Sequence, residues 1–211
     1  MSVLHFPDSL GLADLATLVR RARAVAPDGA VRLQTRGRTL GVWVEVLGGS
    51  GLFAEGAALG VRGLELARPP EDGALDAVVA TASLADRFAR DGHGAVTLAL
   101  PPARAHAAWA GATGALSGWS EVGLVPANDL LSAARAGVEE IAGGAPAAAG
   151  SHAVQALRAR VWGRRLDGDV PAGAAFAAYA LGFARPGDQA VVRRSGRWVR
   201  LTLRGGHVVA R

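Results

Sequence analysis

The chain of 211 residues contains no cysteine. This absence excludes disulfide bonds, iron–sulfur clusters, cysteine-ligated zinc and thiol nucleophiles. Lysine is absent as well, and Ile141, Asn128 and Tyr179 are the sole residues of their types, whereas Ala, Gly, Arg and Val are abundant. This bias is typical of a GC-rich genome. Arginine is then the default cation, so its frequency alone does not indicate a nucleic-acid partner.

Familiar catalytic and metal-binding motifs are missing. The five histidines are scattered singly, without the i, i+4 spacing of a zinc site. The cluster Gly48-Gly49-Ser50-Gly51 lacks the lysine of a phosphate loop, and no Gly-x-Ser-x-Gly motif occurs. The acid pairs fall in turns or on the polar side of a predicted helix. We therefore expect no cofactor, no metal ligands and no catalytic residues. The sequence favours a protein that is not an enzyme, but an enzyme is not excluded.

We expect no secretory signal and no membrane-spanning segment, because no basic stretch precedes an apolar run near residue 1 and no stretch is long and apolar enough to span a bilayer. We expect a cytoplasmic protein that does not contact a membrane.

The composition indicates a globular fold, because half of the residues are hydrophobic and only 19% are charged. We predict an α+β protein of two modules. Residues 1–110 form a mixed sheet with about three helices, residues 111–127 are a turn-rich connecting segment, and residues 128–211 form a basic helical module that ends in a three-stranded antiparallel sheet.

The first module alternates strand and helix patterns. Asp8 and Ser9 supply the cap of the clearest helix, which has apolar residues at helical spacing over residues 10–26. A hairpin turns around Arg36-Gly37-Arg38, and we expect further helices at residues 83–90 and from Pro101-Pro102 to residue 110. The remaining predicted strands cover residues 3–6, 59–67, 76–81 and 95–100.

The second module has a pattern of three helices followed by strands. Asn128 is predicted to cap the first helix, and the helices cover residues 128–142, 151–162 and 171–181. Residues 143–150 are a low-complexity joint of Gly, Ala and Pro. Turns at Ser195-Gly196 and Gly205-Gly206 divide residues 189–211 into three strands. This order is that of winged-helix modules. The third helix is rich in alanine and has no polar side chains to read bases, which argues against sequence-specific DNA recognition.

Charge is distributed unevenly along the chain. Residues 1–145 hold 12 arginines and 15 acidic residues, a net charge of −3, whereas residues 146–211 hold 11 arginines and 3 acidic residues, a net charge of +8. Such asymmetry is typical of proteins with a polyanionic partner.

The C-terminal hairpin sorts its residues between two faces. With a loop at Ser195-Gly196, Arg193 would lie opposite Trp198 and Val191 opposite Arg200. The apolar face would contain Val192, Val199, Leu201 and Leu203, and the cationic face Gln189, Arg193, Trp198, Arg200, Thr202 and Arg204. We predict a polyanion- or partner-binding set composed of Arg193, Trp198, Arg200, Arg204, Arg158 and Arg165. The plainer interpretation is a solvated strand face on which Arg193 or Arg200 stacks on Trp198.

Three stretches resemble uncharacterised proteins of GC-rich actinobacteria: residues 118–123, with the sequence GWSEVG, Arg135-Ala136-Gly137-Val138 and Ser195-Gly196-Arg197-Trp198. The resemblance covers mainly residues 115–211. It implies a bacterial, cytoplasmic origin and no assigned activity.

The leading hypothesis is a non-enzymatic binding or scaffold protein whose basic C-terminal module contacts a polyanion, such as nucleic acid, or an acidic protein surface. A second hypothesis is an enzyme with an unfamiliar site in a cleft between the modules, near Trp109 and Trp119, where Trp119 would otherwise anchor the joint. A third is an oligomeric structural protein, such as a homodimer, that buries Phe176 and Tyr179 between chains.

Overall fold

The computed structural model describes residues 2–50, 54–92, 94–111, 117–144 and 150–211. The chain divides into two compact units. The first unit comprises Met1–Val46 and Val61–Ala112, and the second comprises Leu47–Gly60 and Thr113–Arg211. Both combine helices with antiparallel strands, which confirms the predicted α+β class. No helix in the described part of the chain has the length and apolar character needed to cross a bilayer.

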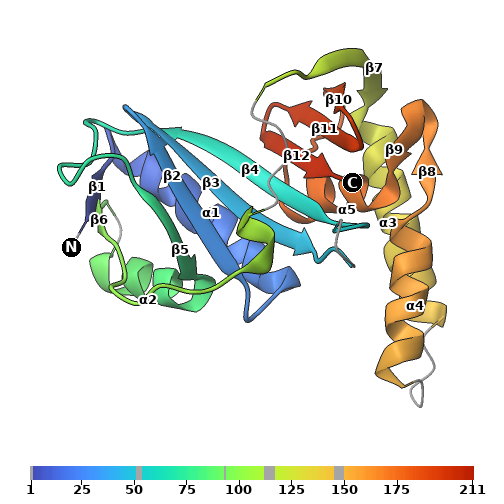
Figure 1. Cartoon of the computed structure of the whole chain (residues 1–211), viewed down its shortest axis with the longest axis horizontal. Helices are drawn as coiled ribbons and strands as arrows, with labels where there is room; N and C mark the ends of the chain where they lie inside the picture. The colour runs from blue at the N-terminus through green and yellow to red at the C-terminus, as the bar shows by residue number, and fades with distance from the viewer. Residues whose placement is uncertain (1, 51–53, 93, 112–116, 145–149) are drawn as a thin grey trace. The chain divides into compact units, whose positions relative to one another are not determined.

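The sheet of the first unit has the strand order β5-β2-β3-β4 (Figure 1). Its strands are β2 (Ala30–Arg36), β3 (Thr39–Leu47), β4 (Ala58–Glu65) and β5 (Asp76–Ala80). A separate pair is formed by β1 (Val3–His5) and β6 (Thr97–Ala99). The predicted hairpin is present, with Arg36 opposite Thr39 and Gly37 in the loop at a φ of 57°.

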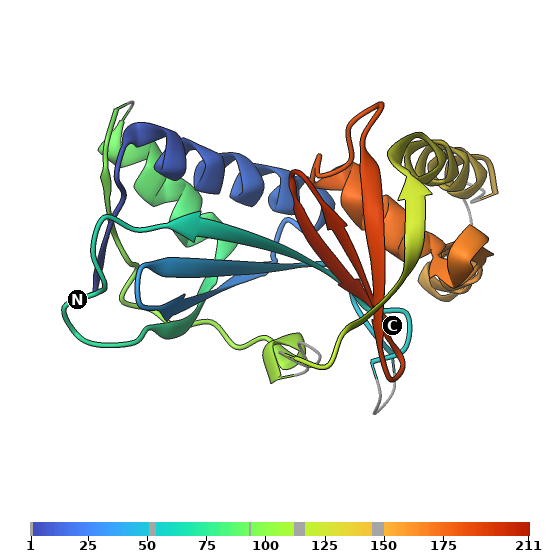
Figure 2. The same cartoon turned by 90° about the horizontal axis from the view of Figure 1, so that it is seen from above.

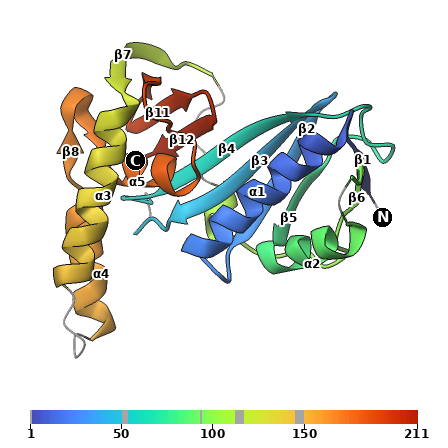
Figure 3. The ribbon, with the colours of Figure 1, turned by 180° about the vertical axis from the view of Figure 1, so that it is seen from behind.

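Two helices cover this sheet. Figure 3 shows α1 (Ser9–Val25) lying across the sheet with α2 (Thr81–Asp91) beside it. The Asp8 carboxylate accepts hydrogen bonds from the backbone N–H groups of Leu10 and Gly11, at 2.9 and 3.1 Å, which caps α1 as expected. The buried side of α1 consists of Leu12, Leu15, Leu18, Val19 and Ala22.

The helix expected from Pro101-Pro102 to residue 110 is wrong. Residues 101–107 are irregular, and only a short 3-10 helix, η1 (Ala108–Gly111), follows. Two consecutive prolines remove two backbone donors, and the following Ala-Arg-Ala-His run has no apolar face to compensate.

In the second unit the strand order is β4-β12-β11-β10-β7, where β4 contributes its first residues. The strands are β7 (Ser120–Pro126), β10 (Gln189–Ser195), β11 (Trp198–Leu203) and β12 (Gly206–Ala210). The connecting segment 111–127 is therefore not turns throughout, because its second half is β7, paired antiparallel with β10. The first half falls largely on residues 112–116, outside the described residues, as does most of the joint at 143–150.

The helices of this unit are α3 (Ala127–Gly144), α4 (Ser151–Trp162) and α5 (Ala172–Ala180). Between α4 and α5 lie β8 (Arg165–Leu166), the 3-10 turn η2 (Asp167–Asp169) and β9 (Val170–Pro171). Figure 2 shows α3 and α5 on one side of β10, β11 and β12. Asn128 does not cap α3, which begins one residue earlier. Its side-chain oxygen instead accepts a hydrogen bond from the Gly187 N–H at 3.3 Å.

The alanine-rich helix α5 is largely buried, as its small side chains predict. The Phe176 ring stacks on Trp162 of α4, with centroids 4.4 Å apart. Phe176, which the dimer hypothesis places between chains, thus has an aromatic partner in its own chain, whereas Tyr179 is 40% exposed.

Candidate functional site

The β10–β11 hairpin has a different loop from the predicted one. Gly196 and Arg197 form the loop, Ser195 lies opposite Trp198, and Arg193 lies opposite Arg200. Gly196 adopts a φ of 56°, and the first of two loop residues is where glycine is favoured. The loop begins one residue later than predicted, so every cross-strand partner moves by two residues.

A shift of two residues leaves each side chain on its predicted face, because side chains alternate with a period of two. The apolar face is buried as predicted, with Val192, Val199, Leu201 and Leu203 at most 6% exposed. The other side is called the cationic face here and is defined by four half-buried residues: Arg193, Trp198, Arg200 and Thr202.

Arg193 is held by two partners on neighbouring strands. Its guanidinium donates to Glu121 Oε2 of β7 at 2.9 Å and to Thr202 Oγ1 of β11 at 3.2 Å. His207 Nδ1 of β12 lies 3.1 Å from the same hydroxyl. These contacts fix the guanidinium in place and neutralise part of its charge.

Arg200 is less well compensated. Its guanidinium lies 4.8 Å from the centroid of the Trp119 ring, a cation–π contact. Its Nε is buried without a hydrogen-bond acceptor among the described residues, and none of the described acidic residues pairs with it. Burial, and then the charge of Arg193, lower the pKa of Arg200. The cationic face thus holds a partly desolvated cation beside a second one, which costs electrostatic free energy.

The aromatic contacts differ from the expected ones. Trp198 was expected to stack with Arg193 or Arg200, but Arg211 lies over it, 5.6 Å from the ring centroid. Arg200 stacks on Trp119 instead. The sequence suggested that Trp119 anchors the joint between the modules, and it could not show that the Trp119 ring lies within reach of Arg200.

The structure brings together only part of the predicted binding set. Arg193, Trp198 and Arg200 share the cationic face. Arg204 lies in the exposed turn after β11, and Arg158 lies on α4. Arg165 lines a separate cavity together with Arg194, Arg197 and Arg211, three arginines that the sequence-based set missed.

The charge asymmetry is smaller when it is counted over the structural units. The second unit holds 12 arginines and 8 acidic residues, a net charge of +4, and the first holds 11 and 10, a net charge of +1. The difference arises because the second unit also includes Glu55 and residues 113–145, which hold 1 arginine and 4 acidic residues. Local arrangement, rather than net charge, must support any argument for an anionic partner.

The fold and these surfaces define an α+β protein of two units whose second unit concentrates arginine on a sheet face and in a cavity. The chain belongs to the family Domain of unknown function (DUF8010), whose model matches residues 1–111. Residues 115–211 match a second family model, Domain of unknown function (DUF8185). Among curated proteins the comparison found no match. The expectation of a family without an assigned activity is confirmed, and the actinobacterial origin stays a prediction.

Proposed function

We propose that this protein is a non-enzymatic, cytoplasmic binding protein whose second unit contacts the phosphates of a nucleic acid through the cationic face. The observation that supports the proposal is the state of Arg200, a half-buried cation beside Arg193 that has no acidic partner among the described residues. An anion shared by the two guanidinium groups would offset both the desolvation and the repulsion.

The chemistry of the face fits phosphate better than base recognition. Arginine donates in a planar fork that suits phosphate oxygens, and Trp119 and Glu121 hold the two forks in place. The helix α5, which would be the reading helix of a winged module, is buried and consists mostly of alanine. Binding is therefore expected to be independent of sequence and sensitive to salt.

The test is fluorescence anisotropy of labelled duplex DNA and single-stranded RNA, with the double variant Arg193→Glu/Arg200→Glu compared with the wild type. The wild type should bind with an affinity that falls linearly with the logarithm of salt concentration. The double variant should bind at least about tenfold more weakly, and its salt slope should fall by about two, one for each lost phosphate contact.

The matched control is Arg158→Glu/Arg185→Glu, which makes the same change in net charge at arginines outside the cationic face. At about 0.15 M salt, where charges beyond about 8 Å are screened, this control should bind like the wild type. Equal losses in both double variants would reject the cationic face as the binding surface. Absence of binding at low salt would reject a nucleic-acid partner and favour an acidic protein surface.

A further inference from the structure

The second unit contains a cavity of about 470 Å³ that is distinct from the cationic face. Consecutive residues of β10 point to opposite sides of the sheet, so Arg193 belongs to the cationic face and Arg194 to the side that carries the helices. The polar side chains that line the cavity are Glu55, Arg165, Arg194, Arg197 and Arg211.

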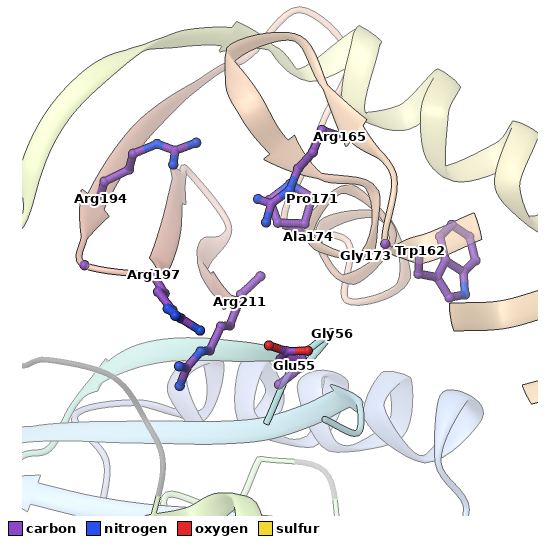
Figure 4. Close-up of a pocket in the computed structure, with 14 residues that line it drawn as sticks. Glu55, Gly56, Trp162, Arg165, Pro171, Gly173, Ala174, Arg194, Arg197 and Arg211 are labelled. Carbon is purple, nitrogen blue, oxygen red and sulfur yellow. The ribbon is translucent and has the colours of Figure 1, made fainter. Parts of the chain in front are cut away.

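The four arginines reach the cavity from three parts of the unit (Figure 4). Arg194 and Arg197 come from the end of β10 and the hairpin loop, Arg165 comes from β8, and Arg211 follows β12. Among the described residues that line the cavity, Glu55 is the one acidic residue. Like charges gathered around one space repel one another, and an anion placed between them would offset part of that repulsion.

Asp169 holds two of these arginines in position. Its carboxylate lies 2.5 Å from Arg194 Nη2 and 3.6 Å from Arg165 Nε. Its backbone oxygen accepts from the same two side chains, at 2.9 and 3.2 Å. Asp169 has a φ of 57° and follows Gly168 at 69°, a backbone conformation that side-chain-bearing residues rarely adopt. One carboxylate shared by two arginines orients them and leaves positive charge in excess.

The amino-terminal end of α5 contributes to the same wall. Gly173 and Ala174, in the first turn of this nine-residue helix, line the cavity, and Pro171 offers no side-chain cap. Backbone N–H groups and the helix dipole favour an anion at such a position. The N-terminus of α5 therefore adds to the case for an anion in the cavity, although the main argument is the convergence of the arginines.

The size and lining of the cavity indicate the class of ligand. The volume exceeds that of a phosphate ion and falls within the range of about 300–1,000 Å³ usual for small-molecule sites. Guanidinium groups match phosphate oxygens in geometry, Glu55 can accept a hydrogen bond from a hydroxyl or amino group, and Trp162 and Pro171 supply apolar wall.

We propose that this arginine-lined cavity binds a small phosphorylated molecule whose phosphate lies among Arg165, Arg194 and Arg197 and whose remaining polar group faces Glu55. The proposal does not depend on nucleic-acid binding by the cationic face. Arg211 contacts both surfaces, since it lines the cavity and lies over Trp198, but the phosphate is placed among Arg165, Arg194 and Arg197, which do not belong to that face.

The test is isothermal titration calorimetry of the full chain with inorganic pyrophosphate at about 0.15 M salt, where nonspecific attraction is screened. The wild type should bind one pyrophosphate with a dissociation constant below about 1 mM. Arg194→Ala/Arg197→Ala should weaken binding by at least about tenfold, because two charge-assisted hydrogen-bond donors are lost. The matched control, Arg193→Ala/Arg200→Ala, should bind within about twofold of the wild type, since both arginines lie on the other face.

Arg197→Lys guards against a folding artefact. Arg197 is exposed in the hairpin loop, so this variant keeps the charge and alters no buried side chain. It should retain binding weakened by only a few-fold. Absence of saturable binding up to about 10 mM would overturn the proposal. Wild-type affinity in Arg194→Ala/Arg197→Ala, or an equal loss in the control, would overturn it as well. Competition of pyrophosphate by single-stranded RNA, with the same arginine dependence, would show that the cavity takes a polymer and would overturn the small-molecule assignment.

Discussion

The absence of a side chain at Gly137 allows α3 to approach α4 closely. A Cβ atom there would lie 2.7 Å from Trp162 Cη2 and closer still to Cζ3, with Val161 Cγ1 at 3.1 Å. Trp162 cannot easily move away, because its ring is buried and stacked on Phe176. From sequence alone, Gly137 is merely a weak helix former, and its packing role depends on a partner 25 residues later.

We predict that Gly137→Ala lowers the free energy of unfolding by about 1–3 kcal/mol, the usual cost of overpacking, although alanine favours the helix. Urea denaturation followed by tryptophan fluorescence measures this change. The control is Gly143→Ala in the same helix, where nothing lies within 4 Å of the added Cβ. That variant should gain about 0.5–1 kcal/mol from helix propensity alone. Equal effects of the two substitutions would contradict the packing argument.

The residues that line the cavity could not be predicted from the sequence. The charge pattern identified the basic hairpin, and alternation correctly placed Arg193, Trp198 and Arg200 on one side. Alternation also places Arg194 on the face of the strand that carries buried residues. Nothing in the sequence shows that the fold brings the Asp169 carboxylate within hydrogen-bonding distance of this guanidinium. From the sequence, Asp169 is an ordinary turn residue, since its positive φ is known only from the structure.

At the scale of elements, an ion pair fastens the edge strand β5 to β2. Arg32 donates to both carboxylate oxygens of Asp76, at 2.8 and 2.7 Å, and Gln34 donates to the same carboxylate at 2.9 Å. The hydrogen bonds from Arg32 are the main reason that the pKa of Asp76 is lowered. A lowered pKa in the folded protein means that the ionised carboxylate stabilises the fold.

We predict that Asp76→Asn lowers the free energy of unfolding at pH 7 by about 0.5–1 kcal/mol, the range of a well-formed exposed pair. The stabilisation by Asp76 is fully present above its unfolded pKa and is lost as pH falls through the lowered folded pKa. The difference between variant and wild type should therefore disappear in acid. Denaturation curves at several pH values test this, with Glu65→Gln as control. Glu65 pairs with Arg38 through a single oxygen, and both side chains are more than half exposed. A pH-independent difference would rule out the ion pair as its cause.

Helices and strands with local patterns were predicted well, and those that depend on distant partners were not. The helix α1 has its own cap and apolar stripe, and β3 alternates over residues 39–46. By contrast, β7 contains glycine and exposed residues throughout most of its length, and it is a strand because β10 pairs with it. A distant partner also explains why Asn128 does not cap its own helix: its side-chain oxygen accepts a hydrogen bond from Gly187, 59 residues away.

At the scale of the whole molecule, the family matches and the structural units divide the chain differently. The second family match begins at residue 115, whereas the second unit also includes Leu47–Gly60, which falls within the first match. This short segment contains the start of β4, which pairs with β12 in the second unit. Gly56 donates to the Arg211 carbonyl at 3.1 Å, and Arg211 donates to the Ala57 carbonyl at 3.0 Å.

The segment also supplies apolar packing to the second unit. Ala57, Ala58 and Leu59 are at most 4% exposed. The side chain of Leu47 packs closely against Gly173, where an added Cβ would lie 2.8 Å from Leu47 Cδ1. Without Leu47–Gly60, β12 would become a bare edge with unpaired backbone groups beside apolar residues, the arrangement that promotes aggregation.

We therefore predict that a fragment of residues 115–211 is unstable, although it contains the whole second family match. It should elute as aggregates in size-exclusion chromatography and melt without a cooperative transition. A chain that joins residues 47–60 to residues 115–211 through a flexible linker should be monomeric and melt cooperatively, because the β12 edge is paired again. A control chain that carries residues 47–60 in scrambled order should behave like the bare fragment, because it adds the same residues without the strand that pairs with β12. Cooperative melting of the bare fragment, with the midpoint of the joined chain, would show that the family boundary, and not the contact-defined unit, is the folding boundary.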